Sequence, residues 1–241
     1  MEIISNISDI SNEKANCMVC GKDVEYSNEA TNAKCHYCGV EEETYILCKD
    51  DHYVCNKCHT RDAVEVIENV CLNTDQDDPM EIAEKLMAHP KIPMHGPEHH
   101  AMVPAVLIAA YQNYIGKKNK DAILEAIKRG QKIPGGYCAL YGACGAGIGV
   151  GIAISILLGA TGLTPEPRSH ANRATAQTLK PIADAGGARC CKKSSRIGLE
   201  EGVKYISDLF DLNWYKELDL CVDCDYTKYN QQCDSNCKYR K

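Results

Sequence analysis

The chain has 241 residues, of which 44% are hydrophobic and 25% are charged. This length and composition are typical of one sizeable core with small satellite modules and exclude two large independent domains. The formal net charge of −6 gives no overall positive field that would attract a polyanion, so nucleic acid is not expected as a partner of the chain. Nucleic-acid binding stays an alternative for the N-terminal module only. The outlying feature is the count of sixteen cysteines.

The first twenty residues indicate that these thiols stay reduced. They carry acids and asparagines where a secretion signal would need a basic start and an unbroken apolar stretch. We therefore expect a cytoplasmic protein. In a reducing compartment, cysteines at short spacings indicate metal or cluster ligands rather than disulfides.

Eight possible metal ligands lie within about forty residues near the N-terminus. Two Cys-x2-Cys turns are followed by a Cys-His-Cys-Cys set, and such turns let two thiolates bind one tetrahedral ion. We predict two structural zinc ions here, because so short a segment is too small for a core without metal. Two pairings stay open, one sequential and one interleaved, in which the second pairs are exchanged. The ligands are Cys17, Cys20, Cys35, Cys38, Cys48, His52, Cys55 and Cys58.

The cysteine groups and the hydrophobic pattern divide the chain into five parts. The expected fold class is a mainly α core domain with a small zinc-ribbon-like N-terminal module of strands and loops and a Cys-rich metal-binding tail. Cys71 is interpreted as a further ligand or as a buried thiol. The expected parts are a flexible terminus (1–14), the zinc-binding module (15–75), a linker with a short helix from about Pro79 to Ala88 (76–94), the helical domain (95–215) and the tail (216–241).

A long apolar segment occupies the middle of the helical domain. No charged residue occurs between Ile133 and Pro165, and the first part of this stretch is rich in glycine. A buried helix is favoured over a membrane span, since basic flanks and aromatic belts are missing. Cys144 would lie at the first turn of that helix, where free N–H groups favour a thiolate, and Cys138 lies close enough in sequence to reach the same centre.

The middle of the chain resembles the α-subunit of iron–sulfur L-serine dehydratases and the related L-cysteine desulfidases. The likeness spans roughly residues 95–210 and rests on Ala-Cys-Gly-Ala-Gly-Ile-Gly-Val (143–150), Asp-Ala-Gly-Gly-Ala-Arg-Cys-Cys (184–191), Gly-Val-Lys-Tyr-Ile (202–206) and Met-Val-Pro-Ala-Val-Leu (102–107). Two departures are Ala183, where the family has a cysteine, and the lack of the family's β-portion. The serine-rich substrate loop is also missing.

This resemblance implies a [4Fe–4S] cluster held by three thiolates, with one iron open as a Lewis acid for a small polar substrate. The three would be Cys144, Cys190 and Cys191, with Cys138 as a replacement or fourth ligand. The leading hypothesis is a lyase-type or sulfur-handling enzyme that acts on an amino-acid-like or thiol-like compound.

Over its full length the chain also resembles an uncharacterised Cys-rich domain family of anaerobic bacteria and methanogenic archaea, whose members are sometimes joined to methyltransferase domains. This likeness implies a rival hypothesis, in which the chain is a non-catalytic zinc and iron–sulfur regulator or accessory protein that partners a methyltransferase or another protein. No membrane association is expected in either case.

A histidine-rich string precedes the first long helix. It offers three imidazoles and a carboxylate, which can act as general bases or metal ligands, and we predict a catalytic role for His95, Glu98, His99 and His100. Arg189, Lys192, Lys193 and Arg196 surround the double cysteine and would neutralise an anionic cluster or form a solvated basic face.

The tail contains four more cysteines in seventeen residues. This spacing suits one tetrahedral zinc or a second iron–sulfur cluster. The predicted ligands are Cys221, Cys224, Cys233 and Cys237.

Overall fold

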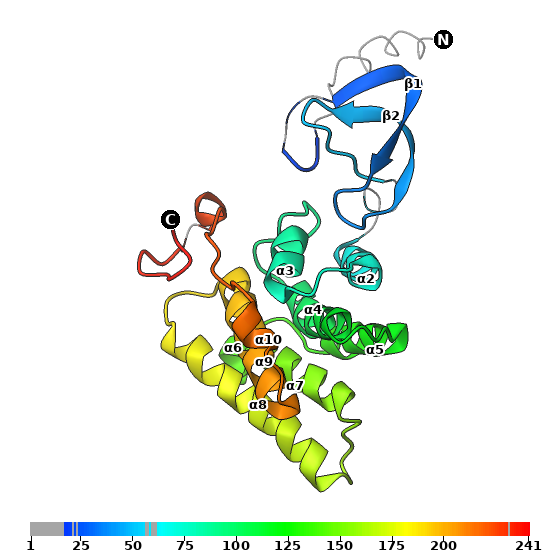
Figure 1. The fold of residues 1–241 in the computed structure, drawn as a ribbon. Coiled ribbons are helices and arrows are strands. Elements are labelled where there is room, and N and C mark those ends of the chain that lie inside the picture. The colour runs from blue at the N-terminus through cyan, green and yellow to red at the C-terminus, as the bar shows by residue number, and fades with distance from the viewer. Residues whose placement is uncertain (1–16, 21, 23, 56–57, 59–61, 231) are drawn as a thin grey trace, which may run out of the picture. The chain divides into compact units, whose positions relative to one another are not determined.

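The structure is a computed structural model that describes residues 17–20, 22, 24–55, 58, 62–230 and 232–241. The predicted flexible terminus, residues 1–14, lies outside the described residues. The chain forms two compact units, residues 1–60 and 61–241, and Figure 1 shows the elements of each. All sixteen cysteines lie within the described residues, and none of them forms a disulfide.

The first unit is built on one β-hairpin. Strands β1 (Val24–Lys34) and β2 (Glu41–Cys48) pair antiparallel, from Val24 opposite Cys48 to Lys34 opposite Glu41. Tyr37 is buried in this unit, but most of its buried apolar side chains are cysteines: Cys17, Cys35, Cys38, Cys48, Cys55 and Cys58. A core made of thiols supplies little hydrophobic stabilisation, which is what a unit stabilised by bound metal requires.

The second unit is helical, so the predicted mainly α class with small N-terminal strands and terminal cysteine groups is confirmed. Its helices are α2 (Ala63–Asn73), α3 (Pro79–Met87), α4 (Glu98–Tyr114), α5 (Lys120–Gly130), α6 (Tyr137–Leu140), α7 (Gly145–Leu157), α8 (Pro165–Asp184), α9 (Cys191–Phe210) and α10 (Trp214–Glu217), followed by the short 3-10 helix η2 (Thr227–Tyr229).

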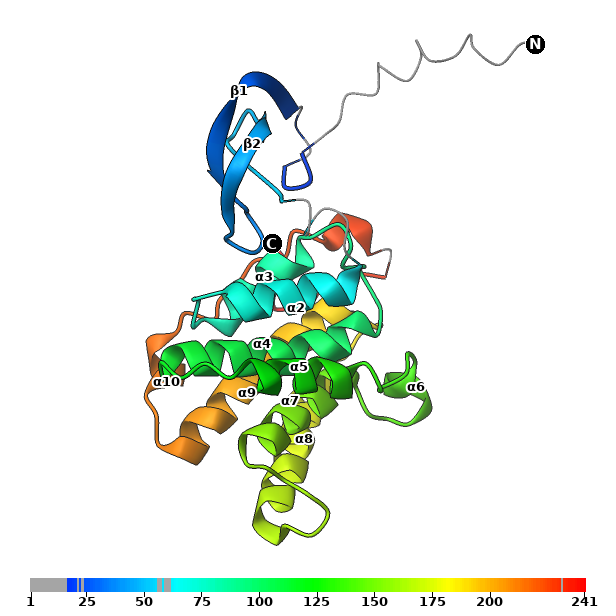
Figure 2. The ribbon, with the colours of Figure 1, turned by 90° about the vertical axis from the view of Figure 1, so that its right-hand side faces the viewer.

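Helix α4 forms the centre of the helical unit. Every side chain from Ala101 to Ala110 is buried, because α2, α3, α5, α7 and α9 all pack against this helix. Figure 2 shows α4 and α5 side by side, with α7 and α8 forming a second layer. A helix buried on all sides reads as uniformly apolar in sequence, and this explains why its pattern carries no clear polar face.

Helix α7 contains the glycine-rich part of the apolar segment. A methyl group added at Gly149 would lie 2.9 Å from Pro104 Cδ, so glycine is required where α7 crosses α4. The helix is only 13 residues long. Within the described residues, no helix has the length and apolar character to cross a bilayer.

Residues 61–94 belong to the helical unit, whereas the sequence analysis placed them in the zinc-binding module and in a linker. The reason is the amphipathic face of α2, whose Val66, Ile67 and Val70 are buried in the helical unit. Cys71 is also on α2 and fully buried, and burial raises the pKa of its thiol. This environment is that of a buried thiol rather than a ligand.

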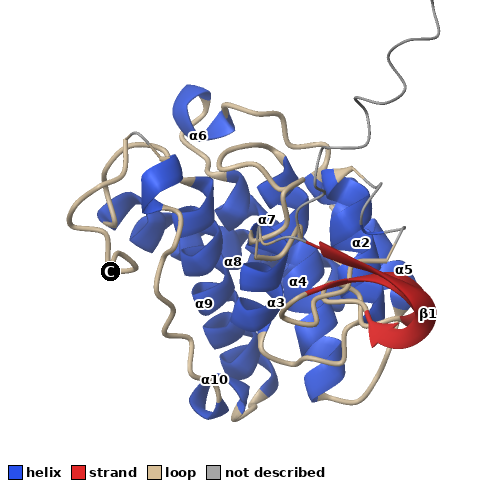
Figure 3. Cartoon of the chain, turned by 90° about the horizontal axis from the view of Figure 1, so that it is seen from above, coloured by secondary structure: helices blue, strands red, loops and turns tan. Residues whose placement is uncertain are grey.

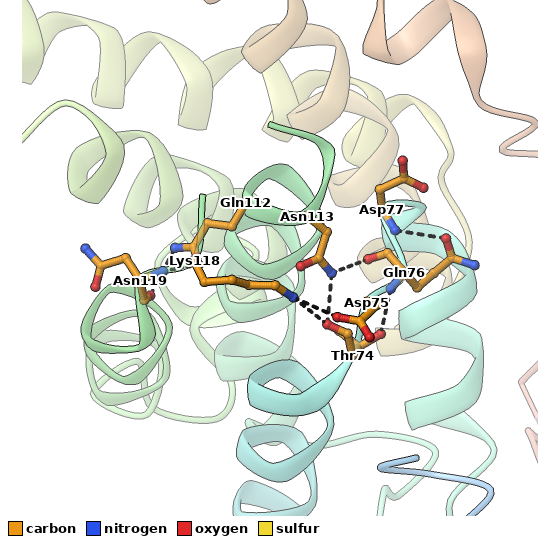
Figure 4. A network of polar contacts seen from close by, with 8 residues as sticks. All are labelled: Thr74, Asp75, Gln76, Asp77, Gln112, Asn113, Lys118 and Asn119. Carbon is orange, nitrogen blue, oxygen red and sulfur yellow. Dashed lines mark hydrogen bonds and ion pairs between the residues drawn. The ribbon is translucent and has the colours of Figure 1, made fainter. Parts of the chain in front are cut away.

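The connection between α2 and α3 is fixed by the turn between α4 and α5 (Figure 4). The Asn113 side chain donates to the carbonyl of Thr74 at 3.1 Å and to that of Gln76 at 2.6 Å, and Lys118 Nζ donates to Thr74 at 2.9 Å. These bonds satisfy backbone carbonyls that no helix uses. They also hold α3 in place beside α9.

Two peripheral segments flank the helical bundle. Helix α6 stands apart from its neighbours in Figure 3, and it follows Gly136, which has φ of 86°. Its Leu140 is 77% exposed. Beyond α10 the tail has little regular structure, although the amide of Cys224 donates to the carbonyl of Tyr239 at 2.6 Å and closes a loop.

Candidate metal centres

The first unit gathers its eight predicted ligands into two groups of four. One group is Cys17, Cys20, Cys48 and His52, and the other is Cys35, Cys38, Cys55 and Cys58. Within each group the ligand atoms all lie within 4.8 Å of one another, so each could bind a metal ion. The four pairs alternate between the two groups, so the arrangement is interleaved and not sequential, but Cys48 and His52, rather than Cys55 and Cys58, join the first turn.

The β-hairpin explains the interleaving. Antiparallel pairing puts the start of β1 beside the end of β2, so the first Cys-x2-Cys turn meets Cys48 and His52. The second turn lies at the opposite end, between the strands. The chain after β2 returns to that end through the bridge between Cys35 and Tyr53, which brings Cys55 and Cys58 to it.

Distances between the ligand atoms fit a single tetrahedral ion in each group. Cys20 Sγ lies 3.5 Å from Cys48 Sγ, and Cys38 Sγ lies 3.7 Å from Cys55 Sγ. Four sulfurs around one ion at a bond length of about 2.3 Å would stand about 3.8 Å apart. Cys48 Sγ is also 3.4 Å from Nδ1 of His52, which suits a mixed thiolate and imidazole site.

Backbone amides prepare these thiols for metal. The amide of Asp50 donates to Cys48 Sγ at 3.2 Å, and the amide of Cys55 donates to Cys35 Sγ at 3.4 Å. Burial opposes ionisation of Cys48, but the amides of Asp50 and His52 and the His52 ring outweigh it and lower the pKa of this thiol to about 6. Thiolate is the form that binds metal, so the loop favours the ligand state.

The second unit brings three helix N-termini to one place. The ring of His100 on α4 packs on Gly145, the first residue of α7, where a methyl group would overlap it. The amide of Gly96, just before α4, donates to the thiol of Cys191, the first residue of α9. Cys144, the N-cap of α7, interacts electrostatically with Cys191. We call this the amino-end site: His95, Glu98, His99, His100, Cys144 and Cys191.

His99 is the most constrained side chain of the amino-end site. It is 1% exposed, and its Nδ1 lies 3.2 Å from the carbonyl oxygen of Gly96. Because a carbonyl only accepts, Nδ1 carries the proton, and Nε2 of the neutral ring presents a lone pair. Burial holds the pKa of His99 at about 3, so the ring is neutral near pH 7.

The Nε2 lone pair of His99 is buried and has no hydrogen-bond partner among the described residues. Nδ1 of His95 and Oε2 of Glu98 are also buried without a hydrogen-bond partner among the described residues. His100 makes a similar contact through Nδ1, which lies 3.0 Å from the carbonyl oxygen of Ile133. A ring that donates Nδ1–H to a carbonyl and leaves Nε2 bare is the state in which histidine binds metal or accepts a proton.

The four central cysteines are not gathered into one group. Cys191 is directed to Gly96 and Cys144, whereas Cys190, the N-cap of α9, interacts with Cys224 and Cys237 of the tail. Cys138 is exposed on α6 and joins neither set within the described residues. For Cys190 and Cys191, burial raises the pKa of the thiol and outweighs the amides that donate to it.

The first turns of α9 carry an excess of buried positive charge. Lys192, Lys193 and Arg196 are 2%, 6% and 1% exposed. Arg196 forms a two-pronged ion pair with Glu84, at 2.5 and 2.8 Å. The two lysines instead donate to carbonyls at the C-terminal ends of α3 and α8, and neither has a carboxylate partner in the described part of the chain. The two lysines are therefore buried positive charges without a carboxylate partner, as their predicted role of neutralising an anionic centre requires.

Three residues that shape these centres could not be found from spacing. Gly96 links Cys191 to His99 through its own peptide groups, Asn230 of the tail is hydrogen-bonded to His95, and Glu84 neutralises Arg196. The pairs Gly96–Cys191, Asn230–His95 and Glu84–Arg196 are each far apart in sequence, so no spacing rule points to them. The histidine string itself was found because its composition is unusual.

Most of the second unit matches a known family model. A model described as a family of unknown function (DUF5714) matches residues 67–240. The chain belongs to this family. The DUF5714 match spans the amino-end site and the tail, and it leaves the unit with the two interleaved ligand groups outside. The expected membership of an uncharacterised family is thus confirmed, while the likeness to iron–sulfur dehydratases stays a prediction. No curated protein and no solved structure matches the chain.

Proposed function

We propose that this DUF5714 protein is an iron–sulfur enzyme of the lyase or sulfur-handling type, with its reactive centre at the amino-end site. The cluster would be a [4Fe–4S] held by Cys144, Cys191 and one further central cysteine, Cys190 or Cys138. The substrate would be a small polar compound with an anionic group. When bound, a cluster with one open iron supplies a Lewis acid.

The observation that carries the proposal is the buried, unpartnered Nε2 of His99, whose ring is held by Gly96, the residue whose amide donates to Cys191. An unpaired buried polar atom is costly and is retained where a ligand or substrate satisfies it. Helix N-termini favour thiolates and anions. The same end of the unit carries Lys192 and Lys193, whose charges would balance a negatively charged cluster or substrate.

The chain's own residues then have distinct tasks. His99, neutral and with Nε2 bare, would accept a hydrogen bond from the substrate and orient it, and the carbonyl of Gly96 holds its ring in the required tautomer. Glu98, whose Oε2 is also buried without a partner among the described residues, would take up the proton that the substrate loses. The tail contacts the site through Asn230, which interacts with His95. We assign the two ligand groups of the first unit to structural zinc.

Anaerobic purification of the full chain tests the proposal. We expect iron and acid-labile sulfide in the wild type, with a charge-transfer absorption spectrum that shifts on addition of L-serine or L-cysteine. Cys144→Ser and Cys191→Ser should lose that spectral shift together with the iron that carries it. Cys71→Ala is the matched control, because this thiol is buried on α2 away from the site.

Two results would count against the enzyme. Zinc without iron or sulfide would contradict the cluster. A cluster whose absorption spectrum does not change with any small substrate would favour the rival function as an accessory protein of a methyltransferase. The His99→Gln variant separates the two further. In an enzyme it should keep the cluster and lose turnover, whereas in an accessory protein it should change neither.

A further inference from the structure

We propose that the C-terminal tail folds around a second iron–sulfur cluster, whose ligands are Cys190, Cys224, Cys233 and Cys237. This set differs from the one that spacing predicts, because Cys190 of α9 replaces Cys221. The inference does not depend on the reactive centre proposed above. Because Cys190 is then a ligand of the tail cluster, the third thiol of the cluster at the amino-end site is Cys138.

The first observation is that the adjacent cysteines at the start of α9 have different neighbours. The amide of Gly96 donates to Cys191, which also interacts with Cys144, while Cys190 interacts with Cys224 and Cys237, and the two adjacent thiols interact with each other. Two neighbouring residues on either side of a helix start have side chains about a third of a turn apart. One helix terminus therefore serves two centres, each with its own thiol.

The second observation is how the tail is anchored beside Cys190. Cys224 and Arg240 form an isolated bridge, and the amide of Arg240 donates to the carbonyl of Cys237 at 2.9 Å, so Cys224 and Cys237 approach each other. Asp234 packs so closely on Gly187, three residues before Cys190, that a methyl group there would lie 2.6 Å from Asp234 Oδ2. Cys233 is the neighbour of Asp234 and comes to the same place.

Cys221 lies elsewhere. Its thiol is exposed, and the residue lines a surface cavity together with Glu200, Tyr215 and Lys238. Its amide is used in a turn with the carboxylate of Asp219 at 3.1 Å. The Cys-x2-Cys spacing with Cys224 is thus present in the sequence but is not used as a chelating turn.

Charge gives the third observation. Arg196 is hydrogen-bonded to the thiol of Cys224 as well as to Glu84, and Lys192 Nζ lies 4.2 Å from the ring centroid of Tyr226 in the tail. Buried cations need compensating negative charge. Four thiolates around a cluster or a divalent ion carry a net charge of about −2, which Lys192 and Lys193 together would balance, since Glu84 already neutralises Arg196.

In this structure the thiols of the tail centre are not drawn together around the position of a single ion. In the described part of the chain, only the two groups of the first unit have three or more ligand atoms within 4.8 Å of one another. The sulfurs of the tail centre are therefore more widely spaced. Thiolates that each bind a different iron of a cluster stand at the corners of a larger tetrahedron than thiolates that share one ion.

Native mass spectrometry of the full chain, prepared without oxygen, tests the assignment by the mass that each variant loses. We expect Cys190→Ser, Cys224→Ser and Cys237→Ser each to lose one cluster, and Cys221→Ser to keep it. Serine is a good N-cap, so Cys190→Ser preserves the cap that Cys190 provides to the amide of Lys193, and circular dichroism should show an intact helical unit.

The outcomes separate this inference from the proposed function. Cys191→Ser should keep the tail cluster and lose the one at the amino-end site. If Cys221→Ser loses the centre and Cys190→Ser retains it, the ligand assignment is wrong. If the variants lose one zinc ion instead of a cluster, the iron–sulfur assignment is wrong.

Discussion

Replacing Glu84 with glutamine would leave the guanidinium of Arg196 buried in the helical unit without its carboxylate partner. In the wild type, Nε and one terminal nitrogen of Arg196 donate to the two carboxylate oxygens at 2.5 and 2.8 Å. The arginine side chain is 1% exposed and the glutamate side chain 25% exposed. The pair joins α3 to α9 across more than a hundred residues of sequence.

The expected loss follows from this burial. Removing one partner of a buried ion pair costs about 3 to 5 kcal/mol, because the remaining charge stays desolvated. Glutamine keeps one acceptor oxygen and Glu84 is partly solvated, so we expect a value near the lower limit, about 3 kcal/mol. For a chain of this size that corresponds to a decrease in melting temperature of about 6 to 12 °C.

Urea unfolding followed by far-ultraviolet circular dichroism measures the effect. The matched control is Glu125→Gln, which removes a pair of the same kind, Arg129 Nε to Glu125 at 2.8 Å, from an exposed face of α5. That variant should lose only about 0.3 to 0.5 kcal/mol. The double variant Glu84→Leu with Arg196→Met should be more stable than Glu84→Gln, because it leaves no buried charge.

Equal losses in Glu84→Gln and Glu125→Gln would refute the reasoning, since burial would then make no difference. A double variant less stable than either single one would also refute it. That result would mean that Arg196 contributes through its contacts with the rings of Tyr226 and Tyr239 rather than through charge.

Three further predictions concern the amino-end site and the first unit. Gly145→Val should displace the His100 ring and cost about 2 kcal/mol in urea unfolding, whereas Gly162→Val, at an open position, should be neutral. Burial holds the pKa of His99 at about 3, so the unfolded chain binds more protons between pH 6.5 and pH 3. Wild-type stability should therefore fall with decreasing pH in that window by about 1.4 kcal/mol per unit, a slope that His99→Gln removes and His170→Gln retains. Removal of zinc alone should collapse the dispersion of the amide NMR signals of residues 24–48 and leave the helical signals unchanged, because each unit is compact on its own and the centres proposed for the helical unit hold iron.

Much of the fold was predictable from local sequence. The helices α3, α5, α7 and α9 follow from their amphipathic or apolar patterns, and the caps Asp78 and Asn119 begin two of them. The boundary between the units was not predictable. The cysteine pattern predicts a metal-binding module that reaches Cys71, but Cys71 lies on the buried face of α2 and belongs to the helical unit. Tertiary packing decides such a boundary, and spacing carries no information about it.

The candidate site shows the same division. Sequence composition pointed to the histidine string and to the double cysteine, and the structure places both at one end of α4 and α9. Sequence could not separate Cys190 from Cys191, because the direction of each thiol depends on which element faces it. Nor could it choose between the two pairings in the first unit, since both satisfy the same spacing and only the β-hairpin distinguishes them.

The interleaved ligand groups have a consequence for how the first unit acquires its metal. Fourteen residues separate Cys20 from Cys35, and 27 separate Cys20 from Cys48, so the native pairing closes a loop about twice as long as the sequential alternative. Doubling a loop costs only about 0.6 kcal/mol in closure entropy, but it slows the encounter of the two ends. An ion that arrives before β1 and β2 have paired will first bind the nearer cysteines, in a trapped arrangement. The nascent chain therefore needs either the hairpin before the metal, or a metal that exchanges its thiolates fast enough to correct the error.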